Sequence, residues 1–177
     1  MHQHSVLPST MPAATVRPIS DLSPFEQLVL SYSTGPQSPN EGGEVWDYFP
    51  SASNLRLESA TPGPPARVSY LLTVIPKQCN YLGSLHGGCA ATIVDILSST
   101  LLLALSKPGQ YSLGGVSRNL KLTYLRPVPV GSEIRVMCEM VHMGKRMVLL
   151  RAEIQRMDGG ICVVAEHEKA NTDPAAI

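Results

Sequence analysis

The stretch that decides the fold runs from His86 to Leu105 and reads HGGCAATIVDILSSTLLLAL. It is the one long helix predicted in the body of the chain, and Lys107-Pro108-Gly109 ends it. Its residues are apolar around almost the whole helix, and such a helix must be covered by other elements. The composition of this stretch therefore predicts a helix wrapped by the rest of the domain.

Strand-like segments lie on both sides of this helix. They are separated by turn-forming residues, and they cover residues 55–59, 66–75, 113–125, 133–142, 147–156 and 161–169. In the segment 133–142, Ile134, Val136, Cys138 and Met140 alternate and are expected on one face. Strands grouped around a single central helix indicate an α+β fold with an antiparallel sheet.

A short helix is expected near the N-terminus. Ser23 can cap it, Pro24 suits its first position, and Glu26 can close a capping box. Its predicted buried stripe consists of Phe25, Leu28, Val29 and Tyr32.

The 177 residues suit one domain with an N-terminal extension. We expect a flexible arm over 1–20, the short helix and a long loop over 21–50, and the main domain over 51–172. The loop contains Trp46, Tyr48 and Phe49, which could cover an apolar tunnel.

Bulk composition narrows the classes of partner. Lysine plus arginine and aspartate plus glutamate number 14 each, which argues against a nucleic-acid partner. The four cysteines lie far apart, so no metal site is expected. The chain shows no secretory signal and no uninterrupted apolar run of ~18 residues, so we expect no transmembrane segment and a cytoplasmic location, with mitochondria as the alternative.

His86-Gly87-Gly88 lies where the long helix begins. The first backbone N–H groups of a helix lack intrahelical partners and can stabilise a developing oxyanion. Glycine also lets a ligand approach the backbone closely. The alternative is a glycine-rich helix start selected for packing alone.

Asp95 places a carboxylate in the middle of the apolar helix, where it needs a partner or a function. Nine residues at ~100° each put it roughly opposite His86, so one subunit could hardly use both in one site. Two helices side by side in a dimer could do so. Alternatively, Ser98, Ser99 or the partner subunit satisfies the carboxylate.

Ser117 and Asn119 alternate with their neighbours in the predicted strand 113–125. Regular alternation places both on one face, where a hydroxyl could position a water molecule.

Together these residues resemble a known family. Asn80-x-x-Gly83-x-Leu85-His86-Gly87-Gly88, Asp95, and Gly115-Val-Ser-x-x-Leu-x-Leu-x-Tyr-Leu-x-Pro127 are similar to hot-dog acyl-CoA thioesterases of the phenylacetyl-CoA thioesterase type, especially the eukaryotic thioesterase superfamily members. The resemblance covers about residues 50–170. It implies hydrolysis of an acyl thioester, acyl-CoA or another acyl-pantetheine, with coenzyme A only as part of substrate and product. It also implies a homodimer, which could pair again into a tetramer.

The resemblance also implies roles for the matching residues. Asp95 would activate water, or attack as a nucleophile, in the partner subunit's site, where Ser117 helps to place the water. The N–H of Gly87 would polarise the thioester carbonyl, with Asn80 orienting the substrate and His86 holding the geometry. Residues expected near substrate or coenzyme A are Gly88, Asn119, Tyr124, Arg126, Pro127, Lys145 and Arg146. His167 is expected to be structural or exposed.

Two other functions stay open on the sequence. A hot-dog lyase or isomerase would share the fold, although such enzymes usually pair an active-site histidine with an acid in another context. A non-catalytic acyl-thioester-binding protein would not need the aspartate in the helix.

Overall fold

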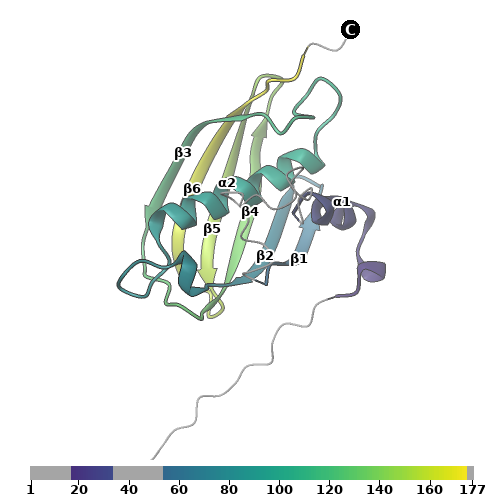
Figure 1. Ribbon diagram of the computed structural model, residues 1–177. Helices are drawn as coiled ribbons and strands as arrows, with labels where there is room; N and C mark the ends of the chain where they lie inside the picture. Colours follow the sequence, from purple (N-terminus) through teal and green to yellow (C-terminus); the bar gives the residue numbers. More distant parts are fainter. Residues whose placement is uncertain (1–16, 34–53, 175–177) are drawn as a thin grey trace, which may run out of the picture.

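The computed structural model describes residues 17–33 and 54–174. One six-stranded antiparallel sheet, in the order β1-β2-β4-β5-β6-β3, packs on the long helix α2 (Gly87–Ala104) (Figure 1). The strands are β1 (Arg56–Thr61), β2 (Arg67–Thr73), β3 (Val116–Tyr124), β4 (Glu133–Met143), β5 (Met147–Arg156) and β6 (Ile161–Ala170). The other elements are α1 (Pro24–Ser33) and the 3-10 turns η1 (Ile19–Asp21) and η2 (Pro76–Gln78). The predicted α+β hot-dog arrangement is confirmed.

The core lies between α2 and one face of the sheet. Ile93, Leu97 and Leu101 of α2 are fully buried, as are Ile134 and Val136 of β4. Cys138 and Met140 continue the same face of β4, so its predicted alternation is confirmed. Apolar burial of this kind contributes ~25 cal/mol per Å² and makes this face the main source of stability.

α2 also has the length and mean hydropathy of a membrane span, with 18 residues and a value of 1.6. Thr92, Asp95, Ser98, Ser99 and Thr100 interrupt its apolar run, and for this reason the sequence does not predict a membrane span there. In the fold, the sheet and α1 both pack on α2, and residues such as Val94 and Leu102 are fully buried.

The predicted capping box at the start of α1 is present. The backbone N–H of Glu26 donates to Ser23 Oγ at 3.2 Å, and Ser23 N–H donates to Glu26 Oε2 at 2.9 Å. Arg17 pairs with the same carboxylate and also donates to the carbonyl of Glu58 in β1. The described chain thus already packs on the domain at Arg17, within the arm expected over 1–20.

The predicted buried stripe of α1 is partly wrong. Val29 is fully buried and Phe25 partly so, but Leu28 and Tyr32 are 41% and 38% exposed. Glu26 and Ser33 occupy the inner face instead, because the capping box and Arg17 turn the carboxylate inward. The expected arm before residue 17 and the aromatic loop (Trp46, Tyr48 and Phe49) lie outside the described residues.

A β-bulge at Arg118 interrupts the alternation of β3. Ser117 pairs with Lys169 of β6, whereas Asn119 pairs with Glu168, so the register shifts by one residue between them. Paired residues share a face, and Lys169 is buried while Glu168 is on the other face. Ser117 and Asn119 therefore lie on opposite faces, and the prediction that they share one is wrong.

Replacing Glu26 with glutamine should lower the free energy of unfolding by about 1–2 kcal/mol at pH 7. The hydrogen bond from Arg17, followed by those from Ser23, lowers the pKa of Glu26 from 4.5 to about 2. Because the folded-state pKa is the lower one, the contribution is complete above pH 4.5 and disappears as the pH falls toward 2.

Urea unfolding at pH 7 and at pH 2.5 measures this difference. Asp21→Asn, which removes an exposed carboxylate from η1, is the matched control and should change stability little. A wild-type advantage over Glu26→Gln that is equally large at both pH values would contradict the assignment.

Candidate active site

Asp95 projects from the middle of α2 toward the edge strand β3. Its Oδ1 accepts a hydrogen bond from Ser117 Oγ at 2.9 Å, and His167 Nε2 lies 3.2 Å from the same oxygen. No described residue bonds the other carboxylate oxygen, and the side chain is 43% exposed. One oxygen thus fixes the carboxylate in place while the group stays open to solvent.

His167 of β6 is the third member of this cluster. Its ring is 1% exposed, with Nδ1 2.7 Å from Ser98 Oγ and Nε2 2.9 Å from Ser117 Oγ. Burial, and then the charge of Lys169, lower the pKa of His167 to about 4, although Asp95 acts in the opposite direction. The ring is therefore neutral at neutral pH, with Nε2–H directed at Ser117 and Asp95 while Ser98 donates to Nδ1.

The expectation that His167 is structural or exposed missed its place in the site. It alternates with Ala165 and Lys169 along the last strand, and this period of two already puts all three on one face. The sequence did not reveal which strand pairs with β3. That strand is β6, not β4, and this pairing brings Ser117 beside His167.

The serines that follow Asp95 do not satisfy its carboxylate. Ser99 Oγ donates to the main-chain oxygen of Asp95 at 2.7 Å, and Ser98 Oγ is engaged by His167 Nδ1 at 2.7 Å. The alternative in which Ser98 or Ser99 satisfies the carboxylate is therefore wrong, whereas satisfaction by a partner subunit stays a prediction.

A second cluster forms where α2 begins. His86 is the N-cap, and its Nδ1 accepts a hydrogen bond from Gly88 N–H at 3.0 Å. The N–H of Gly87 has no acceptor among the described residues, and Gly87 borders an open hollow of ≈ 380 Å³. Of the two glycines, Gly87 is thus the available oxyanion donor, because the N–H of Gly88 is engaged.

Tyr124 and Asn80 shape this hollow. Tyr124 Oη donates to the carbonyl of Gly87 at 2.8 Å, and a Cβ at Gly87 would lie 3.2 Å from the Tyr124 ring. Asn80 Oδ1 accepts from the N–H groups of Leu82 and Ser84 at 3.0 Å and 3.2 Å, which closes the turn before α2. Tyr124 holds Gly87 in place, and glycine is needed there for close approach.

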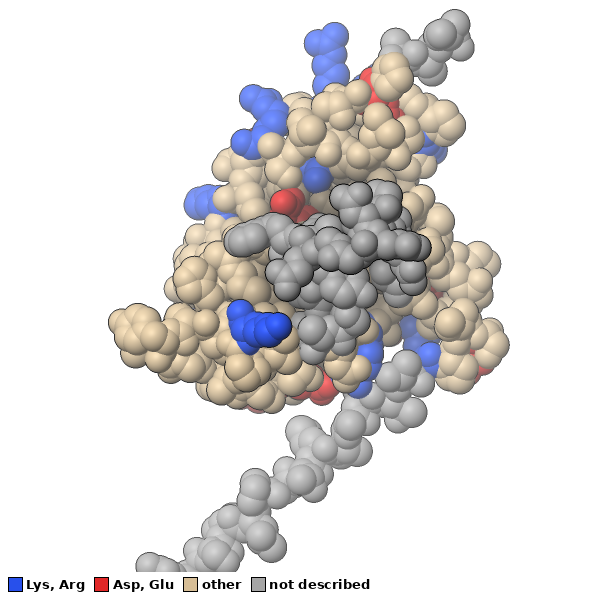
Figure 2. Space-filling view, in the orientation of Figure 1, with Lys and Arg blue, Asp and Glu red and all other residues tan. Residues whose placement is uncertain are grey.

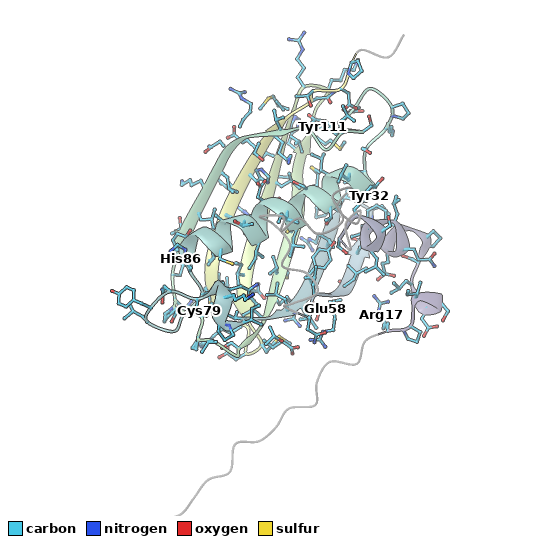
Figure 3. The ribbon with its side chains drawn as sticks, viewed as in Figure 1. Arg17, Tyr32, Glu58, Cys79, His86 and Tyr111 are labelled. Atoms are coloured by element: carbon cyan, nitrogen blue, oxygen red, sulfur yellow. The ribbon has the colours of Figure 1, made fainter. Side chains whose placement is uncertain are left out.

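The two clusters lie apart within one chain. Gly87 and Asp95 are separated by about 12 Å along the helix, by its rise per residue. The ends of β3 repeat this separation, since Ser117 is at its start and Tyr124 at its end. Figure 3 shows His86 at one end of α2 and Tyr111 near the other.

The predicted substrate-binding residues also divide into two groups. Tyr124, Arg126 and Pro127 line the hollow at Gly87, and Arg126 donates to the carbonyl of Ile161. Exposed Lys145 and Arg146 lie in the β4–β5 hairpin, at the end of the sheet where β3 begins. Lysines and arginines are scattered over the face seen in Figure 2, in keeping with the balanced charge.

Within residues 17–33 and 54–174, no three His, Cys, Asp or Glu side chains gather in a group that could hold a metal ion.

Comparison with known proteins defines the class. Residues 82–163 match the family model of the thioesterase superfamily. Human acyl-coenzyme A thioesterase 13 is 28% identical over 116 residues, which cover 65% of this chain and 78% of the relative. The chain is thus a distant homologue of acyl-CoA thioesterases, and its residues 82–163 resemble the thioesterase superfamily.

Solved structures agree on the fold. Zebra fish thioesterase superfamily member 2 superposes with a TM-score of 0.64 and 23% identity, over 82% of this chain and 94% of that one. A hypothetical thioesterase protein of Streptococcus pneumoniae, solved with coenzyme A, gives a TM-score of 0.60 and 22% identity over 71% and 92%.

Tyr124→Phe should reduce kcat about threefold to tenfold and change KM less, because the hydrogen bond that positions the Gly87 carbonyl is lost. Steady-state thiol release from an acyl-CoA measures both constants. Tyr32→Phe, on the exposed side of α1, is the matched control. A Tyr124→Phe enzyme with wild-type kcat would show that Gly87 needs no support from the hydroxyl.

Proposed function

We propose that this protein hydrolyses an acyl thioester, with acyl-CoA as the preferred class, to a free carboxylic acid and a thiol. The observation that carries the proposal is the half-exposed Asp95 carboxylate, anchored through one oxygen by Ser117 and next to the neutral ring of His167. A carboxylate held in this way can bind and deprotonate a water molecule. The acyl-CoA thioesterase homologue supports the substrate class.

The reaction balances with these groups alone. Asp95 removes a proton from water, whose oxygen forms a bond to the thioester carbonyl carbon. The negative charge that develops on the carbonyl oxygen is stabilised by the N–H of Gly87 and the positive end of α2. Collapse of the intermediate breaks the carbon–sulfur bond, and the thiolate takes up the proton from Asp95.

The distance between Asp95 and Gly87 supports a site shared by two subunits. β3 is an edge strand with almost all of its residues exposed, including Val116 at 52% and Tyr124 at 54%. Pairing two copies through this edge would cover it and place the Asp95 of one beside the Gly87 of the other. Lys145 and Arg146 of one copy would then join Arg126 of the other around the phosphates of coenzyme A.

The lyase alternative requires a histidine that reaches the substrate. His167 is next to the acid, but its ring is 1% exposed and both nitrogens have protein partners. In this arrangement the histidine orients Ser117 and Asp95, and the exposed carboxylate is the group that contacts substrate and water. This supports hydrolysis over a histidine-based addition or elimination.

Asp95→Asn should lower kcat by ~10²-fold or more, on the scale of the loss of a general base, and Asp95→Ala should be at least as impaired. Thiol release from a series of acyl-CoAs tests this and also defines the preferred chain length. Asp158→Asn is the control, because it neutralises an exposed aspartate while keeping a residue that suits its turn. Wild-type rates in both Asp95 variants would refute the role of Asp95.

Mixing two inactive variants tests whether the site is shared. An Asp95→Asn subunit keeps Gly87, and a Gly87→Val subunit keeps Asp95. If each site combines both subunits, random exchange should restore about 25% of wild-type activity, because half of the dimers contain one intact site. If each site belongs to one subunit, the mixture stays inactive after exchange has been verified by mass spectrometry.

A further inference from the structure

Lys169 is a buried cation that the proposed reaction does not use. It lies on the inner face of β6, two residues beyond His167, and is 6% exposed. Its Nζ donates to Ser99 Oγ at 2.7 Å, and Ser99 Oγ lies 2.7 Å from the main-chain oxygen of Asp95. No Asp or Glu of the described chain lies within 4.0 Å of the ammonium group, so it has no ion-pair partner there.

The surroundings of Lys169 contain little other charge. In register, it faces Ser117 of β3 and Val148 of β5, and the next inward residue of β5 is Leu150. The loop before β3 contributes Tyr111, whose hydroxyl donates to the Gly144 carbonyl. The titratable residue that β4 places on its buried inner face is Cys138.

The ionisable groups that interact electrostatically with Lys169 are Asp95 and His167 of the candidate site. α2 has two titratable residues, Cys89 in its first turn and Asp95 near its middle. Burial lowers the pKa of Lys169 and the charge of Asp95 counteracts this, while Lys169 in turn lowers the pKa of His167. A buried cation is costly unless an opposite charge or a function offsets it, and Asp95 is the carboxylate that interacts with it.

We propose that Lys169 is a positioning residue that acts through its charge, keeping the Asp95–His167 pair as a carboxylate and a neutral imidazole. This inference rests on the proposed function of Asp95. A protonated His167 would form an ion pair with Asp95 and reduce its ability to accept a proton from water. The ammonium group of Lys169 opposes that protonation, so the enzyme stays active at lower pH than it would without this charge.

The test is the pH dependence of kcat/KM for thiol release. Removing the charge in Lys169→Met should make His167 take up a proton more readily, so the midpoint of the acid limb should rise by about one pH unit. Lys169→Arg keeps the charge and should restore the wild-type midpoint. Lys107→Met, which removes an exposed charge in the loop after α2, is the control.

The outcomes separate the possible failures. If Lys169→Met lowers the rate equally at every pH and leaves the midpoint unchanged, Lys169 only supports packing and the inference is overturned. If Asp95→Asn is fully active, the proposed function itself fails, whatever Lys169→Met does.

A measurement on the unmodified enzyme covers the case in which Lys169→Met does not fold. Nitrogen NMR of enzyme labelled in lysine and histidine, with the Lys169 signal assigned from Lys169→Arg, should show a protonated Lys169 at pH 7. The His167 ring should stay neutral down to about pH 5, since its pKa is about 4. A neutral amine at pH 7 would overturn the inference, because an uncharged Lys169 cannot act on the pair.

Discussion

The site depends on how the polar residues of an apolar helix are satisfied. α2 packs on the sheet, so each polar side chain on its inner face needs a hydrogen-bond partner. Ser98 forms a hydrogen bond with His167, and Ser99 accepts one from Lys169. Thr100 Oγ1 lies 2.8 Å from the hydroxyl of Tyr70. These contacts fix the rotation and axial position of α2 on the sheet. Asp95, one turn earlier, is thereby held beside β3.

The bulge in β3 provides the other half of this geometry. An uninterrupted strand would put Ser117 and Asn119 on one face, whereas the extra residue at Arg118 turns only Ser117 toward the helix. Ser117 then bonds Asp95 and His167 together, from an edge strand whose outer side is open. The Ser117 hydroxyl from β3 and the His167 imidazole from β6 thus both contact one carboxylate oxygen of Asp95 in α2.

Division of labour along α2 follows from helix geometry. The start of the helix supplies an unpartnered N–H at Gly87, held by Tyr124 from the end of β3, while the middle supplies the carboxylate. Gly87 and Asp95 cannot come together within one chain, because the helix is rigid and its rise per residue is fixed. The same elements that build one hydrophobic core thus produce two separate polar clusters, at opposite ends of the exposed edge strand β3.

Much of the fold was determined by the sequence alone, for a local reason. Periodicity, turn residues and the capping box are properties of neighbouring residues, so the strand segments, the central helix and the start of α1 were all predictable. The glycines at the start of the helix and Asp95 within it were predictable as chemistry, because each is unusual in its setting. The tertiary structure alone decided the rest: the inward turn of Glu26, the bulge that separates Ser117 from Asn119, and the places of His167 and Lys169. Each of these depends on which strand lies beside β3 and which residues face α2, and such long-range pairing leaves no mark in the local pattern.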